Sequence, residues 1–148
     1  MSLMDRRRRQ TFEAATPMLA PGERVDLITC ANVGTVSVRR QVATAALVGV
    51  ISGGTMMASV RPRQMYLVLT DRRLLFFDAA TATGKPGKLL IELSRPYVAA
   101  GQARKGMLGL TLITELALAG QTEGLKLTFP KPCRADGRQF VGLLPAAP

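Results

Sequence analysis

The sequence contains no histidine and no tryptophan, and its tyrosine and phenylalanine residues make up only 5% of the chain. Without histidine, imidazole acid–base catalysis and imidazole metal sites are excluded. The scarcity of aromatic rings excludes a stacking platform of the kind that binds single-stranded nucleic acid. Acidic residues are scarce as well, because 10 Asp and Glu stand against 20 Lys and Arg and give a formal net charge of +10. Anionic ligands or surfaces are therefore the expected class of partner.

Cysteine occurs only twice, at Cys30 and Cys133. The two residues form no C-x-x-C motif, so the sequence indicates neither a zinc knuckle nor a redox motif. A chain of 148 residues buries enough core to fold without a covalent crosslink. We expect two reduced, mostly buried thiols, with a disulfide as the alternative.

No group of residues suggests catalysis. Serine, threonine and cysteine nucleophiles have no histidine to activate them, and no S-x-x-K spacing is present. The carboxylates form no evident catalytic pair along the sequence. The segment GKPGK at 84–88 lacks the spacing of a phosphate-binding Walker loop. We expect a protein that is not an enzyme and that has no cofactor and no metal site.

The N-terminal residues 1–20 are predicted to form a basic arm. The run Arg6–Arg9 is followed by no apolar stretch long enough for an export signal, so we expect a cytoplasmic protein, peripheral at most at the inner face of the membrane. The arm is expected to be frayed, with two helical turns between Thr11 and Leu19, because Pro17 and Pro21 interrupt it.

Residues 21–148 are predicted to form one mainly β domain. Alternating or β-branched runs predict strands, and a tight turn is expected at Asp71–Arg72. The clearest alternation places Leu125, Leu127 and Phe129 on one inner face. The predicted strands cover residues 23–38, 65–70, 73–78, 89–93, 107–117 and 125–129.

A short C-terminal helix is predicted after the last strand. Asp136 is the expected N-cap and Gln139 its capping-box partner. The apolar side of this helix would contain Phe140, Val141 and Leu144. Six or seven antiparallel strands and one amphipathic helix bury their faces best when the helix plugs the end of a partly open barrel.

Two segments of the sequence resemble a known family. The run YLVLTDRRLLFF at 66–77 is similar to the hairpin of bacterial pleckstrin-homology-like (PH-like) and GRAM-like domains, and PGERV at 21–25 is similar to their lead-in to the first strand. The segment Arg138–Leu144 also stands where that fold places its single helix. The resemblance spans about residues 21–145. It implies a seven-stranded barrel, no catalysis, and binding of lipid headgroups or protein partners.

The chain departs from the family pattern between the first two predicted strands. Residues 41–60 contain no charge, although eukaryotic members of the family carry phosphoinositide-binding Lys and Arg in the corresponding loop. As a helix this segment would be about 30 Å long, which is enough to span a bilayer. Arginines at both ends argue against a span. A span would also place the first strand on the opposite side of the membrane from the sheet that it should join. We therefore expect a hairpin with its tip at 52–55.

This uncharged hairpin and the arginines are the candidate binding residues. The hairpin would contact a membrane or another copy of the chain through Leu47, Val48, Val50, Ile51, Met56 and Met57. Burial of the hairpin over the barrel is the simpler alternative. Anionic lipid would be bound by Arg39, Arg40, Arg61, Arg63, Arg72 and Arg73, although the last two would also suit a solvated turn.

The expected function is a binding or assembly module that associates with an anionic membrane surface or with itself. One alternative is an adaptor that binds a protein partner on the barrel face. The other is nonspecific binding of nucleic acid through the basic arm, which satisfies the electrostatic requirement but has no recognition helix beside it.

Overall fold

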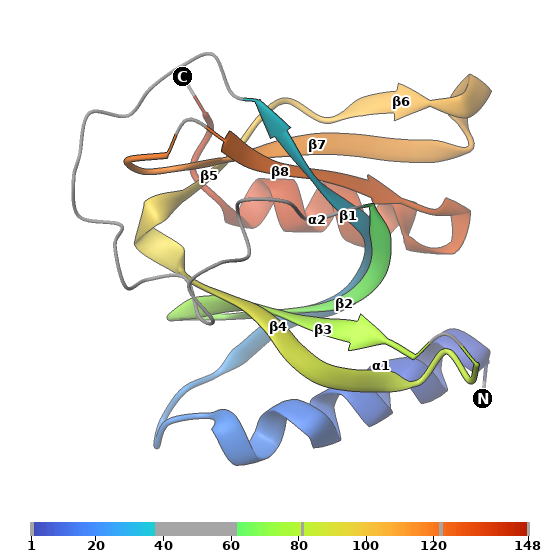
Figure 1. Cartoon of the computed structure of the whole chain (residues 1–148), viewed down its shortest axis with the longest axis vertical. Coiled ribbons are helices and arrows are strands. Elements are labelled where there is room, and N and C mark those ends of the chain that lie inside the picture. Colours follow the sequence, from blue (N-terminus) through green and yellow to red (C-terminus); the bar gives the residue numbers. More distant parts are fainter. Residues whose placement is uncertain (1, 38–61, 81, 122, 148) are drawn as a thin grey trace.

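One antiparallel sheet of eight strands forms the body of the protein. The computed structural model describes residues 2–37, 62–80, 82–121 and 123–147 (Figure 1). The strands pair in the order β4-β3-β2-β1-β8-β7-β5, and the short β6 pairs with β7. Their bounds are β1 Val25–Ser37, β2 Arg63–Thr70, β3 Arg73–Ala79, β4 Pro86–Ser94, β5 Val98–Ala100, β6 Arg104–Gly106, β7 Thr111–Leu118 and β8 Glu123–Phe129.

The sheet curls but does not close. Its first strand belongs to both halves, because the segment from Val25 to Val33 pairs with β2 while the segment from Asn32 to Ser37 pairs with β8. The outermost strands of the pairing order, β4 and β5, leave the sheet open. The predicted class, a mainly β, partly open antiparallel barrel with a C-terminal helix, is confirmed. The predicted insert at 41–60 falls within 38–61, outside the described residues, between β1 and β2.

The core fills the inside of the curled sheet. The inner residues of β8, Leu125, Leu127 and Phe129, are fully buried as predicted. Helix α2, Arg134–Leu143, packs against β7 and β1, and the ring of its Phe140 lies 5.8 Å from that of Phe129. This close approach depends on Gly137, where an added Cβ would lie only 2.7 Å from Cδ2 of Phe129.

Strands β2 and β3 are buried on both faces. Every residue from Met65 to Thr70 is buried, as is every residue from Leu74 to Phe77. Successive side chains of a strand point to opposite faces, so a second layer must cover the outer one. Helix α1, Leu3–Ala15, supplies this layer over β2 and its neighbours, because it contacts β1, β2 and β4 and runs below them in Figure 1. The alternating strand predicted at 65–70 is therefore covered from both sides.

The prediction of a frayed N-terminal arm is wrong. Helix α1 has 13 residues and begins in a capping box, in which Ser2 Oγ accepts from Asp5 N at 3.1 Å and an Asp5 carboxylate oxygen accepts from Ser2 N. Its Arg8 binds the carboxylate of Asp136 and donates from Nε to the Ile28 carbonyl at 3.3 Å. Contacts with partners 20 and 128 residues away hold the helix on the barrel, and local sequence patterns do not reveal them. The short 3-10 helix η1, Thr16–Met18, follows.

The predicted capping box at Asp136 is wrong for the same reason. Helix α2 begins after the 3-10 helix η5, Lys131–Cys133, and its N-cap residue, Cys133, makes no side-chain capping bond. The Asp136 carboxylate instead accepts hydrogen bonds from Arg8 and, at 3.1 Å, from Thr29 Oγ1. The predicted apolar side of the helix is confirmed, because Phe140 and Leu144 are buried and Val141 packs against the core.

Candidate functional site

Only some of the predicted binding residues belong to the part of the chain that the structure describes. Three arginines, Arg39, Arg40 and Arg61, fall outside it, as do all six apolar contact residues, Leu47, Val48, Val50, Ile51, Met56 and Met57. The roles predicted for these residues stay predictions. The remaining three arginines, Arg63, Arg72 and Arg73, lie on β2 and at the β2–β3 turn.

Arg73 belongs to a partly buried ion-pair network. Its Nε lies 2.9 Å from Glu23 Oε2, and its Nη1 lies 2.9 Å from Glu92 Oε2. The Glu23 side chain is only 1% exposed and also accepts from Thr70 Oγ1 at 2.6 Å. The hydrogen bond from Arg73 lowers the pKa of Glu23 to about 2, although burial opposes this effect. Arg73 therefore ties the lead-in before β1 to β3 and β4, and its side chain is not solvated at the turn.

The other two arginines differ in their partners. Arg63 Nη2 lies 2.6 Å from Asp78 Oδ1 on the neighbouring strand, and the Arg63 side chain stays about half exposed. Arg72 is exposed at the β2–β3 turn and donates to the Pro21 carbonyl at 3.5 Å, but it forms no ion pair with any described residue. Of the three, Arg72 has the guanidinium that is most accessible to an anion.

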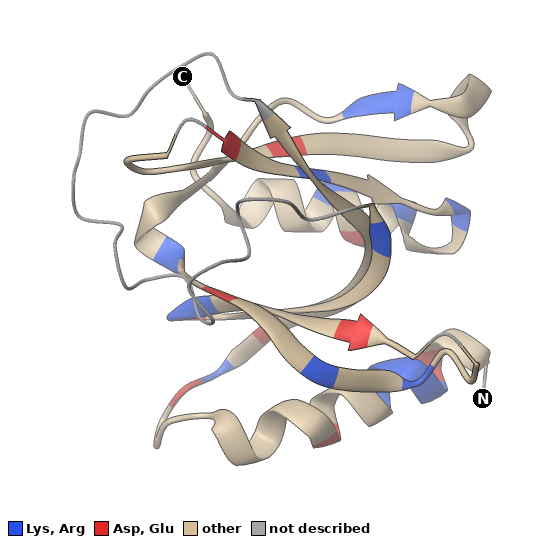
Figure 2. Ribbon diagram, in the orientation of Figure 1, with Lys and Arg blue, Asp and Glu red and all other residues tan. Residues whose placement is uncertain are grey.

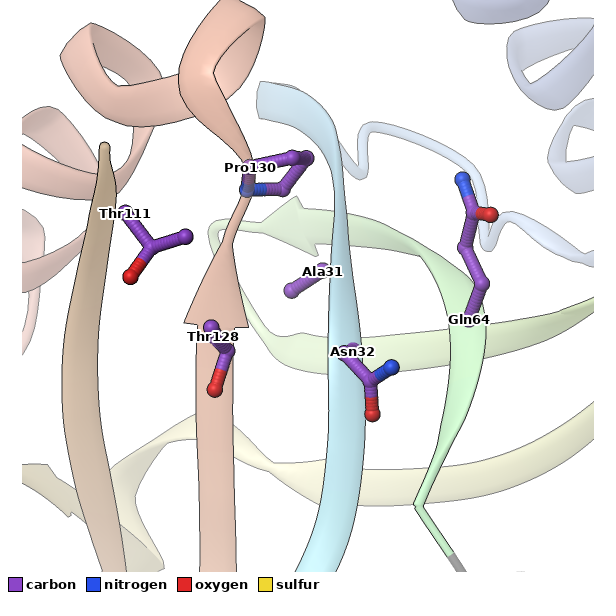
Figure 3. Close-up of a pocket in the computed structure, with 6 residues that line it drawn as sticks. All are labelled: Ala31, Asn32, Gln64, Thr111, Thr128 and Pro130. Atoms are coloured by element: carbon purple, nitrogen blue, oxygen red, sulfur yellow. The ribbon is translucent and has the colours of Figure 1, made fainter. Parts of the chain in front are cut away.

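A small hollow lies on the outer face of the barrel near the start of β2 (Figure 3). The register of the sheet places Thr128, Asn32 and Gln64 opposite one another on β8, β1 and β2, so their side chains form one polar row across three strands. The hollow has a volume of about 280 Å³ and is completed by Ala31, Thr111 and Pro130. Its amides and hydroxyls can exchange hydrogen bonds with a neutral polar group. Single polar residues on strands give no sequence signal, so this row was not predictable from the sequence.

A larger hollow, of about 680 Å³, lies between helix α1 and the barrel and shares Gln64 and Pro130 with the first. Its polar groups are engaged with the protein itself. Arg7 Nη2 donates to the Thr83 carbonyl at 2.8 Å, and Tyr66 Oη donates to the Gly84 carbonyl at 2.5 Å. Burial raises the pKa of Tyr66, so its phenol keeps its proton. This hollow therefore marks the interface between helix α1 and the barrel. Arg7 and Tyr66 have little hydrogen-bonding capacity left there for a ligand.

Both cysteines are free and buried, as predicted. The sulfur atoms of Cys30 and Cys133 lie 3.2 Å apart, and Met4 Sδ lies 3.7 Å from Cys133 Sγ. The hydrogen bond to Cys133, together with burial, raises the pKa of the Cys30 thiol. The pair belongs to the packing between β1, η5 and α1, and among the described residues no group of three His, Cys, Asp or Glu is placed to hold a metal ion.

The strand predicted at 107–117 begins later than expected, at Thr111. Residues Met107–Gly109 instead form the 3-10 turn η4, which joins β6 to β7. Both Met107 and Leu108 adopt positive φ angles, 46° and 57°, and Gly109 follows at 89°. Left-handed backbone costs about 1–2 kcal/mol for a residue with a Cβ. Of the leucines at 108, 110 and 112, only Leu112 faces the core, because the turn directs the other two into solvent.

None of the helices that the structure describes is long and apolar enough to cross a bilayer. Comparison with protein-family models and with curated proteins found no match for this sequence.

Proposed function

We propose that this chain is a non-enzymatic, PH-like module that attaches to an anionic membrane surface, or assembles with its own copies, through residues 41–60. The arginines beside that segment assist through electrostatic attraction, which contributes about 1 kcal/mol for each basic residue near an anionic surface. The proposal also includes a cytoplasmic location with peripheral attachment to the membrane.

The supporting observation is where the chain leaves and re-enters the barrel. Val33 pairs with Arg63 at the start of β2, and β1 continues past it to Ser37, which pairs with Glu123 of β8. A Cβ added at Gly34 would lie 3.1 Å from Pro62 Cγ, which shows how closely the two strands approach there. The described residues that flank 38–61, Ser37 and Pro62, therefore lie at the ends of two strands that are paired in one sheet. A hairpin that dips into a surface needs this arrangement, whereas a single bilayer span would carry its two ends to opposite sides.

The distribution of charge supports an anionic partner. Among the residues that the structure describes, arginines hold seven of the ten acidic residues in ion pairs. Six arginines take part in these pairs, so 14 of the 20 bases remain outside them against only three acidic residues. The acidic residues held in this way are Asp5, Glu23, Asp26, Asp78, Glu92, Glu115 and Asp136.

The test is vesicle flotation at low and high salt, with neutral and with anionic lipid, combined with light-scattering mass on the same samples. The wild type should float with anionic vesicles only, and salt should weaken the binding. The double variant I51D/M56D should lose flotation. A matched control, F12D/M18D, adds the same charge at exposed apolar positions of α1 and η1 and should still float.

The outcomes distinguish the two modes of attachment. Absence of flotation, with a mass of two or more subunits that I51D/M56D reduces to one, would assign residues 41–60 to self-association. If I51D/M56D keeps both the flotation and the mass of the wild type, the proposal is wrong.

A second candidate function is an adaptor that binds a protein partner on the barrel face. It is favoured by the polar row of Asn32, Gln64 and Thr128, because two exposed amides and a hydroxyl in line across three strands suit hydrogen bonding to a peptide. Capture of a partner that N32A/Q64A abolishes and I51D/M56D leaves intact would support this function over the first.

A further inference from the structure

The tip of the β6–β7 hairpin presents apolar side chains to solvent. Leu108 is fully exposed, at 105% of its reference area, while Met107 is 72% and Leu110 50% exposed. These three residues fall within four consecutive positions, whereas the other large exposed apolar side chains of the described chain, Leu3, Phe12 and Met18, are more widely spaced. Single exposed apolar residues are ordinary, but a cluster on a protruding turn indicates a contact surface.

The conformation of the tip is fixed by hydrogen bonds. Leu110 N donates to the Met107 carbonyl at 3.1 Å, and the Arg134 guanidinium binds the Gly109 carbonyl. Within this turn Met107 and Leu108 occupy left-handed backbone, which glycine or asparagine would adopt more easily. Neither side chain gains burial within the protein in return. Residues held in unfavourable conformations with no structural benefit are often functional.

Positive charge surrounds the base of this tip. Arg104 and Lys105 stand on β6 immediately before it, and Arg134 reaches it from the start of α2. Among the described residues, the acidic partner of this group is Glu115, whose Oε2 lies 3.6 Å from Arg104 Nη2 with both side chains substantially exposed. Lys105 and Arg134 form no ion pair with the residues that the structure describes. Figure 2 shows Lys and Arg along β6, next to the turn.

We propose that the tip Met107–Leu110 inserts into the interfacial region of an anionic bilayer, where Arg104 and Lys105 contact the phosphate groups of the lipids. The turn carries three apolar side chains at its tip and positive charges behind them. This order matches a bilayer surface, where the apolar acyl chains lie beneath the anionic headgroups. A protein partner would instead need a preformed apolar pocket with acidic walls. The inference rests on the membrane attachment proposed above, but it assigns a contact of its own outside residues 41–60.

The absence of tryptophan makes the tip directly observable. In L108W the single indole reports whether the tip enters lipid. Its emission should shift to the blue when anionic vesicles are added, should not shift with neutral vesicles, and should be quenched by lipids brominated along their acyl chains. Because position 108 has left-handed backbone, L110W, at a φ of −76°, provides a second reporter in ordinary conformation. F12W, on the exposed side of α1, is the control and should not shift.

Two further variants measure the contributions of charge and apolar contact. R104A/K105A should lower the partition coefficient on anionic vesicles about 25-fold, given about fivefold for each basic residue near the surface. L108N should lower it about tenfold or more, because a leucine side chain leaves the apolar region. L3N removes another exposed leucine, on α1, and should have little effect.

The results separate this inference from the proposed function. If the wild type floats while the indoles of L108W and L110W show neither blue shift nor quenching, the tip assignment is overturned and attachment through 41–60 stands. A shift that appears without lipid and grows with protein concentration would show that another copy covers the tip, which also overturns it. If I51D/M56D no longer floats but the reporters in that background still respond to excess anionic lipid, the tip contact is supported on its own.

Discussion

Replacing Glu23 with glutamine removes one charge from the ion-pair network and keeps the shape of the protonated acid. The ordinary pKa of this carboxyl group is 4.5, and in the folded protein it is about 2, chiefly because Arg73 donates to it. At about 1.4 kcal/mol per pKa unit, the ionised form stabilises the fold by about 3 kcal/mol. Since the Arg73 side chain is partly exposed, we expect E23Q to cost about 2–3 kcal/mol at neutral pH.

The sign of the pH dependence follows from the lowered pKa. Above pH 4.5 the carboxyl group is ionised in both the folded and the unfolded chain, so the stabilisation is fully present. As the pH falls from 4.5 to about 2, the unfolded chain takes up the proton first, and the stabilisation is lost. The difference in unfolding free energy between wild type and E23Q should therefore shrink over this interval and approach zero near its lower end.

Urea unfolding, followed by far-ultraviolet circular dichroism from neutral pH down to about pH 2, measures this difference. The control is E13Q, because Glu13 is exposed on α1 and forms no ion pair with any described residue. E13Q should follow the wild type closely across the whole range. A cost of E23Q that stays constant down to the lowest pH would refute the ionic explanation and indicate that the substitution disturbs packing instead.

Three further substitutions test other contacts. G137A should destabilise the protein by about 1–3 kcal/mol, because its methyl group would meet the Phe129 ring at 2.7 Å. G142A, on the same helix, faces open space and should be neutral or slightly stabilising. Thermal unfolding of the two variants measures the difference. L108G should raise the unfolding free energy by about 1 kcal/mol, since it relieves left-handed strain without loss of buried contact, and a destabilised variant would contradict the described turn. R8A removes the bonds to Asp136 and Ile28 and should speed amide hydrogen exchange across α1 by about tenfold or more, with R9A, at an exposed position, as the control.

The sequence predicts best where one local pattern determines the structure. The strict alternation of Leu125, Leu127 and Phe129 identified β8 and its inner face, because a strand with one solvent face must alternate. The turn at Asp71–Arg72 between two apolar runs likewise identified the β2–β3 hairpin, where Thr70 Oγ1 accepts from the backbone of Arg72 and Arg73. These elements, together with the apolar side of α2, were sufficient to predict the class of fold.

Local pattern failed where a distant partner decides the structure. Arg73 suited a solvated turn, but Glu23 and Glu92, 50 and 19 residues away, bind it. Asp136 suited a helix cap, but Arg8 and Thr29 hold it from the other end of the chain. The spacing of Ser2 and Asp5 fits a capping box and could have predicted the start of α1. The run of arginines that follows favoured a frayed basic arm instead.

The leucines at 108, 110 and 112 show a different kind of failure. Their spacing of two fits a strand, and two of them belong to a turn because the backbone turns left-handed before Gly109. A sequence pattern does not reveal positive φ at Met and Leu, since both residues rarely adopt it. This exposed turn is also the proposed lipid contact, Met107–Leu110. That contact was therefore not predictable from hydrophobic spacing.

The dual pairing of β1 has a consequence for how the chain folds. The β2–β3 ladder joins residues only 5 to 13 positions apart, and the β7–β8 ladder joins residues 9 to 17 apart. The β1–β8 ladder joins residues 86 to 96 apart, so it must close a far longer loop before its hydrogen bonds contribute. The β2–β3 and β7–β8 hairpins can thus form early, on opposite sides of β1. The barrel becomes cooperative only when the second half of β1, from Asn32 to Ser37, pairs with β8. Substitutions along that seam should slow folding more than equally destabilising ones in either hairpin.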